Sequence, residues 1–204
     1  MVAGGGVSAV EVYDPRTNKW TRVADMADIR IALGLATLDN DHVLAVGGYK
    51  PGNLYQSTTE MYNVRTNTWT SGTSMDTPRG FAGVVALLNG TVLVTGGYSP
   101  CTQSNVCTES KEYGSMTTIA TCELYSQSTG RWEAVASMNH PRRAHGITVL
   151  NNESVLVVGG ITSPNDLLSI RLSGMTLRPT SGLWLRACSN LETAFRLGCW
   201  ITTR

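Results

Sequence analysis

Short apolar runs separated by tight polar turns dominate residues 1–160 of this chain. An apolar segment, a polar turn and a second, more apolar segment that ends in Gly-Gly occur three times. The first segments are residues 31–38, 81–88 and 144–150, and the second are 42–46, 91–95 and 154–158. One of the turns is Asn89-Gly90, a favoured hairpin turn because both residues tolerate positive φ. Consecutive strands joined by hairpin turns predict an antiparallel all-β fold.

A second pair of predicted strands occurs three times, after the glycines at the start of the chain and after the first two of these Gly-Gly pairs. It begins with Glu-x-Tyr, passes through a polar turn that ends in Asn or Gly, and resumes at a Trp. The aromatic residues are Tyr13, Tyr62 and Tyr125, followed by Trp20, Trp69 and Trp132. Because the spacing is the same in every copy, we expect these side chains to pack in the core or between repeats, where large rings bury much area. An aromatic cage that binds a ligand is the alternative.

Fixed intervals tie these segments into one repeat. In each copy Trp is followed after six residues by Met, after four more by Arg, and after seventeen more by Gly-Gly. The residues are Met26, Met75 and Met138, then Arg30, Arg79 and Arg142, then Gly47, Gly48, Gly96, Gly97, Gly159 and Gly160. Glycine in a strand permits a close backbone approach that a side chain would block, so we expect structural roles for the six glycines. A period in this range indicates an array of blade-like repeats.

These motifs resemble the kelch repeat, which builds β-propellers from four-stranded blades. The resemblance covers roughly residues 2–160, and Asp14-Pro15 completes the Tyr-Asp-Pro of the family in the first copy only. It implies a propeller segment over 1–161, with a partial blade at 1–26, blades at 30–75 and 79–138, and a partial blade at 142–160. Residues 162–204 lack the repeat register, and we expect a poorly ordered tail outside the propeller.

Three blades are fewer than the 4–8 that closed propellers typically use. One explanation is that the sequence is a fragment or a truncated repeat array without a function of its own. The other is that two chains pair head-to-tail and close a six-bladed ring. In both cases the open blade edges favour association.

Recognition is expected in the connection after Gly-Gly, because all the length variation between the copies falls there. The connections cover 49–58 and 98–118. By the resemblance, the three repeated arginines lie on the same face, which commonly binds peptide partners in kelch propellers. A guanidinium there could bind acidic groups or cap backbone carbonyls between blades. The candidate contacts for a protein or peptide partner are Arg30, Arg79, Arg142, Arg143, Tyr98, Lys111, Glu112 and Tyr113.

The sequence favours a binding module over an enzyme. Glu11, Glu60 and Glu123 occupy equivalent positions, whereas an acid–base pair needs unlike environments that separate the two pKa values. No spacing of His or Cys matches a zinc site, and no phosphate-binding or nucleophile motif is present. We therefore expect no catalytic residue, metal or cofactor. The alternative is a carbohydrate-binding propeller or an oxidase that resembles galactose oxidase.

Charge and cysteines leave the compartment open. The chain has 16 basic and 15 acidic side chains, which gives no overall field that favours nucleic acid or anionic membranes. We expect no signal peptide, and the apolar runs are too short to span a bilayer. Cys101 and Cys107 bracket a short polar segment and either form a disulfide or are unrelated thiols, since connectivity cannot be deduced from sequence.

Overall fold

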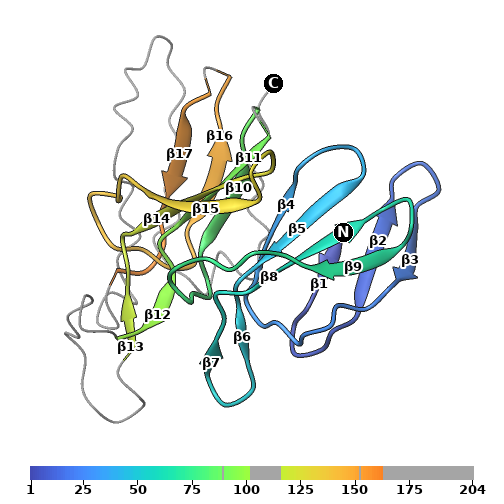
Figure 1. Ribbon diagram of the computed structural model, residues 1–204, viewed down its shortest axis with the longest axis horizontal. Coiled ribbons are helices and arrows are strands. Elements are labelled where there is room, and N and C mark those ends of the chain that lie inside the picture. The colour runs from blue at the N-terminus through green and yellow to red at the C-terminus, as the bar shows by residue number, and fades with distance from the viewer. Residues whose placement is uncertain (89, 102–115, 152, 163–204) are drawn as a thin grey trace, which may run out of the picture.

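The computed structural model describes residues 1–88, 90–101, 116–151 and 153–162. All helices and strands assigned in these ranges are strands, so the described chain is all-β. Two complete four-stranded antiparallel sheets form the middle of the molecule (Figure 1). The first contains β4 (Gly34–Thr37), β5 (His42–Val46), β8 (Thr59–Asn63) and β9 (Thr68–Ser71). The second contains β10 (Gly83–Ala86), β11 (Thr91–Thr95), β14 (Cys122–Ser126) and β15 (Arg131–Val135).

An incomplete sheet flanks the complete pair on each side. On the N-terminal side lie β1 (Val2–Ala3), β2 (Val10–Asp14) and β3 (Lys19–Val23). On the C-terminal side lie β16 (Gly146–Val149) and β17 (Val155–Val158). Strand β10 contacts both β4 and β16, so the first strands of successive sheets lie side by side. This arrangement is that of consecutive propeller blades, and the predicted all-β propeller class is confirmed.

The two connections after Gly-Gly each begin and end as a small hairpin. The first pairs β6 (Tyr49–Lys50) with β7 (Leu54–Tyr55), and the second pairs β12 (Tyr98–Pro100) with β13 (Met116–Thr118). Both hairpins lie along the lower edge of Figure 1. We call this side, with the chain junctions at Arg30, Arg79 and Arg142, the loop face. The opposite side, which carries the turns within each blade, is the turn face.

Burial follows position in the stack of blades. The residues of β5 from Val43 to Val46 are all buried, because neighbouring blades cover both faces of this strand. One apolar cluster joins the two complete blades and contains Leu44, Val46, Val92 and Val94. In contrast, β17 has no fully buried residue. Packing between blades therefore provides the core.

Two of the predicted structural glycines explain the Gly-Gly motif directly. Gly47 and Gly96 have φ of 61° and 56°, in the left-handed region that favours glycine. A Cβ on Gly47 would lie 2.4 Å from the carbonyl oxygen of Arg79, and one on Gly96 would lie 2.3 Å from that of Arg142. The end of each second strand therefore passes too close to the next junction for any side chain.

Candidate functional site

The side chain of the first repeated arginine is buried between blades, although its junction lies on the loop face. Arg30 has no exposed surface. Its Nε donates to Oε1 of Glu60 at 3.0 Å, and its Nη1 donates to the carbonyls of Gly47 and Thr58, both at 2.9 Å. The backbone N–H of Ala27 also donates to Glu60, at 2.7 Å. Arg30 and Glu60 therefore clamp the end of one blade to the next.

The same clamp recurs one blade later. Arg79 is 1% exposed, and its Nη2 donates to Oε1 of Glu123 at 2.7 Å. Burial lowers the pKa of Arg79, and the nearby Glu123 carboxylate opposes that shift. In the third copy, Arg142 is 7% exposed and donates to the carbonyl of Gly159 at 2.6 Å. The expected partner contacts at Arg30, Arg79 and Arg142 are corrected here, because buried guanidinium groups that cap carbonyls between blades do not face a partner.

The Tyr and Trp residues of the second and third copies pack within and between blades. The rings of Tyr62 and Trp69 lie 5.0 Å apart between centroids. The indole Nε1 of Trp69 donates to the carbonyl of Ala24 in the preceding blade at 2.9 Å, and that of Trp132 donates to the carbonyl of Thr73 at 3.1 Å. Each indole thus reaches back to the previous blade, which accounts for the fixed spacing better than an aromatic cage does.

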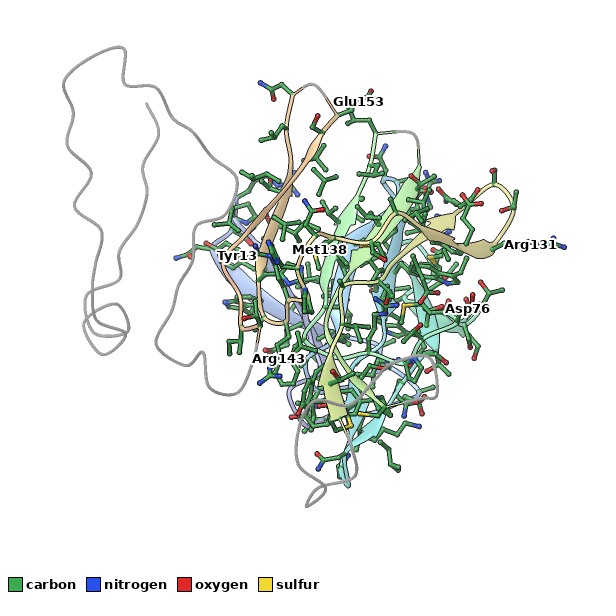
Figure 2. The ribbon with its side chains drawn as sticks, turned by 90° about the vertical axis from the view of Figure 1, so that its left-hand side faces the viewer. Tyr13, Asp76, Arg131, Met138, Arg143 and Glu153 are labelled. Atoms are coloured by element: carbon green, nitrogen blue, oxygen red, sulfur yellow. The ribbon has the colours of Figure 1, made fainter. Side chains whose placement is uncertain are left out.

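A group of aromatic side chains on the loop face connects the two hairpins. The rings of Tyr49 and Tyr55 stack at 5.2 Å, Phe81 lies 5.7 Å from Tyr49, and Tyr98 lies 6.0 Å from Tyr55. The guanidinium carbon of Arg143 lies 4.3 Å from the centre of the Tyr98 ring, a cation–π contact. We call these five residues the tyrosine cluster. In Figure 2, Arg143 lies at the opposite end of the last two strands from Glu153 of the turn face.

The junctions hold the tyrosine cluster in place through the backbone. The residue after each repeated Arg pairs with the residue after the following Gly-Gly, so Gly80 pairs with Tyr98 and Ile31 with Tyr49. A Cβ on Gly80 would lie 3.1 Å from Cε1 of Tyr55, so glycine leaves space for the ring. Phe81 has φ of 55°, a left-handed conformation that is unusual for a bulky residue. Its ring is nevertheless 38% exposed.

Polar atoms give the cluster a directional component. Arg143 is half-buried, and its Nη1 donates to the hydroxyl of Thr118 at 2.7 Å, so the hairpin fixes the guanidinium over Tyr98. Burial raises the pKa of Tyr55 to about 12, with Tyr49 and Tyr98 contributing and Arg143 opposing the shift. The Tyr55 hydroxyl therefore stays protonated at neutral pH. The cluster offers aromatic faces, phenol groups and one fixed cation to a ligand.

Comparison with known proteins agrees with this architecture. The family model of the kelch motif matches residues 2–27 and 35–76. The chain contains kelch repeats. A solved structure titled "Structure of YjhT" superposes with a TM-score of 0.61 at 16% sequence identity over 77% of this chain, which shows a shared fold. The match covers 46% of that chain, so this sequence spans about half of its length. The search of curated proteins found no match.

The predicted contacts of this kelch segment divide into three groups. Tyr98 and Arg143 come together in the tyrosine cluster, and the three repeated arginines are buried. Lys111, Glu112 and Tyr113 lie outside the described residues, as does Cys107, so the Cys101–Cys107 pairing stays a prediction. Tyr49, Tyr55 and Phe81 were not among the residues predicted from the sequence. Tyr49 had a usable signal, since it follows Gly-Gly as Tyr98 does.

The turn face carries a polar network around His42. Its Nδ1 lies 2.9 Å from Oδ1 of Asp39, and its Nε2 lies 3.2 Å from the amide of Asn63. Gln127 of the next blade donates to Asp39 at 2.8 Å, and this contact is the largest cause that lowers the pKa of Asp39. The network therefore joins turns of two blades. Since both ring nitrogens of His42 are engaged, the ring offers no accessible base.

Within the described ranges, His, Cys, Asp and Glu side chains form no group of three that could hold a metal ion. The described chain also contains no helix long and apolar enough to cross a membrane.

Proposed function

We propose that this kelch segment is a protein-interaction module whose protein or peptide partner binds the loop face at the tyrosine cluster. The observation that carries the proposal is the convergence of four aromatic rings and Arg143 from two hairpins and two junctions. Kelch repeats commonly build interaction modules, and this is the general role that the resemblance implies. We do not propose a catalytic role.

The composition of the cluster supports binding. Tyr and Arg are among the residues that most often dominate the binding energy of interfaces. Tyr49, Tyr55 and Tyr98 are half-buried, so their rings are held by packing while part of each surface stays accessible. Rings that are already ordered lose little conformational freedom on binding. Phe81 adds an exposed ring to the cluster, at a left-handed position that holds Ala32 and Ala144 in the other copies.

A peptide-display selection against the full chain tests this proposal. Peptides that bind the wild type should lose about 30-fold or more in affinity for Tyr98→Ala, which is the loss expected at an interface hot spot. Arg143→Ala and Phe81→Asn should also weaken binding and guard against a local folding defect in any single variant. The matched control is Leu88→Ala, which removes a side chain that is 77% exposed on the turn face.

Two results would contradict the proposal. The first is that peptides selected on the wild type bind all three variants with unchanged affinity, which would place their site elsewhere. The second is that a glycan array captures the wild type while no peptide does, and that Tyr98→Ala loses this capture. That outcome would favour the carbohydrate-binding propeller.

We also propose that the open edges of the blade stack associate with a second copy of the chain. The support is the exposure of apolar residues at both edges: Trp20 is 54% exposed on the N-terminal edge and Val158 is 39% exposed on the C-terminal edge. Val46 and Thr95, which correspond to Val158 in the two complete blades, are each 2% exposed. Covering these side chains would add the apolar burial that the end blades lack.

A further inference from the structure

The N-terminal edge carries the residue types that bind the preceding blade elsewhere in the chain. The N-terminal blade (β1 to β3) carries Glu11, Asn18 and Trp20. The next blade (β4, β5, β8 and β9) carries Glu60, Asn67 and Trp69 at the equivalent positions. Glu60, Asn67 and Trp69 each form hydrogen bonds with the segment that leaves the preceding blade. Glu60 accepts the N–H groups of Ala27 and Asp28, Asn67 accepts the N–H of Ala24, and Trp69 donates to its carbonyl. Glu11, Asn18 and Trp20 are all exposed.

The segment that fits this edge occurs in the chain itself. Residues 136–142 (Ala-Ser-Met-Asn-His-Pro-Arg) are in register with 24–30 (Ala-Asp-Met-Ala-Asp-Ile-Arg). The blade of β4, β5, β8 and β9 binds the backbone of 24–30. The blade of β10, β11, β14 and β15 binds the backbone of 73–79 in the same way. Residues 136, 137, 139 and 140 are exposed. The N–H groups of Asn139 and His140 correspond to those of Ala27 and Asp28.

Residue types on the two edges also match each other. Within the chain, Ala24 faces Asn67, whereas Thr73 faces Gly130 and donates its hydroxyl to the glycine carbonyl at 2.7 Å. The two open positions hold Ala136 and Asn18, which is the first of these combinations. The side-chain amide of Asn18 can therefore accept the N–H of Ala136 as Asn67 accepts that of Ala24.

The strands at the two edges complement each other as well. Within the described residues, the C-terminal sheet contains β16 and β17, which correspond to the first and second strands of a blade. The N-terminal sheet contains the third and fourth strands, β2 and β3, while only the two residues of β1 pair with β2. In the complete blades the second and third strands pair over five residues. The place beside β2 is therefore only partly filled.

We propose that β16 and β17 of one copy join β2 and β3 of a second copy in a hybrid four-stranded blade, with the 136–142 segment held by Glu11, Asn18 and Trp20. This inference rests on the proposed self-association and specifies its geometry. By analogy with the complete blades, Val158 pairs with Val10 and Val157 with Glu11. These are the residues that Ala3 and Val2 now pair with, so β17 displaces β1. The exchange replaces two paired residues by four.

Two copies close a ring in this arrangement. Each copy supplies one edge of each kind, so two identical hybrid blades form, related by two-fold symmetry. Each chain contributes about three blades, and six lies within the usual range of 4–8. Head-to-tail contacts that close in this way cover both edges of the described blades.

Sedimentation equilibrium of the full chain is the first test. The monomer mass is 21.9 kDa, so the ring is expected at twice that mass. Trp20→Asp and Val158→Asp each place a carboxylate at one edge, on side chains that are 54% and 39% exposed, and each variant alone should be monomeric. Leu88→Asp, with a side chain 77% exposed on the turn face, is the matched control and should remain dimeric.

Mixing the two edge variants separates the hybrid blade from other modes of association. Trp20→Asp keeps an intact C-terminal edge and Val158→Asp keeps an intact N-terminal edge. An equimolar mixture should therefore form a heterodimer through one hybrid blade. Circular dichroism of each variant checks that its strands are retained.

The outcomes divide cleanly. A monomeric wild type at all concentrations would overturn both self-association and the hybrid blade. A dimeric wild type whose edge variants remain monomeric when mixed would preserve self-association and overturn the head-to-tail hybrid. Dimeric edge variants would overturn the hybrid blade too, since contacts would then lie elsewhere. Rescue by mixing supports the inference.

Discussion

Glu60 and Glu11 occupy the same position in successive copies of one motif, yet their environments differ. Glu60 is 3% exposed and pairs with Arg30. Glu11 faces solvent. The strands that carry them are paired alike, since both lie opposite the fourth strand of their blade. The comparison teaches that the strand sets where the carboxylate stands, whereas the neighbouring blade decides whether it is buried.

The Tyr–Trp pairs separate the same two effects. Ring centroids lie 5.3 Å apart for Tyr13 and Trp20 and 5.0 Å apart for Tyr62 and Trp69. Trp20 is nevertheless 54% exposed, while Trp69 is partly buried and hydrogen-bonded to Ala24. Contact within the hairpin is therefore local, and burial comes from the stack.

The largest expected difference is between Glu123→Ala and Glu11→Ala. Removing Glu123 leaves the buried guanidinium of Arg79 without its carboxylate, and breaking a buried ion pair costs about 3–5 kcal/mol of unfolding free energy. Glu11→Ala should change stability by less than about 0.5 kcal/mol, as surface substitutions usually do. Urea denaturation of dilute protein measures both. Equal losses for the two variants would contradict a role for the neighbouring blade.

A pH effect of up to about 3 kcal/mol is expected at the last junction, where His145 stands in place of Leu33 and Ala82. The His145 side chain is 9% exposed and its Nε2 contacts the Thr95 hydroxyl at 2.8 Å. Its buried Nδ1 makes no hydrogen bond with the part of the chain that the structure describes. Burial, aided by the charge of Arg142, lowers its pKa from 6.5 to about 4.

The sign follows from the lowered pKa. The unfolded chain takes up the proton near pH 6.5, before the folded protein does, so stability should be constant above that pH and fall between pH 6.5 and 4. Urea denaturation across this range measures the slope. His145→Leu should remove this component, and an unchanged slope in that variant would assign the pH dependence to other groups.

A smaller contrast is expected for the tryptophans. Trp69→Phe removes the bond to the Ala24 carbonyl and should cost about 1–2 kcal/mol, from the hydrogen bond and the lost contact area. Trp20→Phe should lie within about 0.5 kcal/mol of the wild type. Thermal denaturation at low protein concentration compares them. A cost for Trp20→Phe as large as that for Trp69→Phe would mean that the indole is needed within the hairpin.

The smallest contrast concerns the turn asparagines. Asn67 and Asn18 both have positive φ, so glycine is the appropriate replacement. The side-chain oxygen of Asn67 accepts from Tyr62 and from Ala24, whereas that of Asn18 accepts from Tyr13. Asn67→Gly should cost about 1 kcal/mol and Asn18→Gly a few tenths less. Denaturant midpoints resolve the difference, and a reversed order would contradict the account.

The sequence was sufficient for the fold because the repeat fixes strand order and local pairs. The kelch resemblance and the all-β class are confirmed. The burial of Arg30 could not be predicted from the sequence, since it depends on whether Glu60 lies close enough to pair with the guanidinium group. The tyrosine cluster was only partly foreseen, because Tyr55 occupies no repeated motif position and the position of Phe81 holds Ala32 and Ala144 in the other copies. The rings meet only when the two hairpins converge.

Native-state amide hydrogen exchange of dilute protein tests most directly the claim that the neighbouring blade completes each clamp. The N–H groups of Ala27 and Asp76 donate to Glu60 and Glu123, both at 2.7 Å, and should exchange slowly. The N–H of Asn139, at the equivalent position of the open edge, should exchange much faster. Equal protection of Asn139 and Asp76 in the monomer would contradict the account.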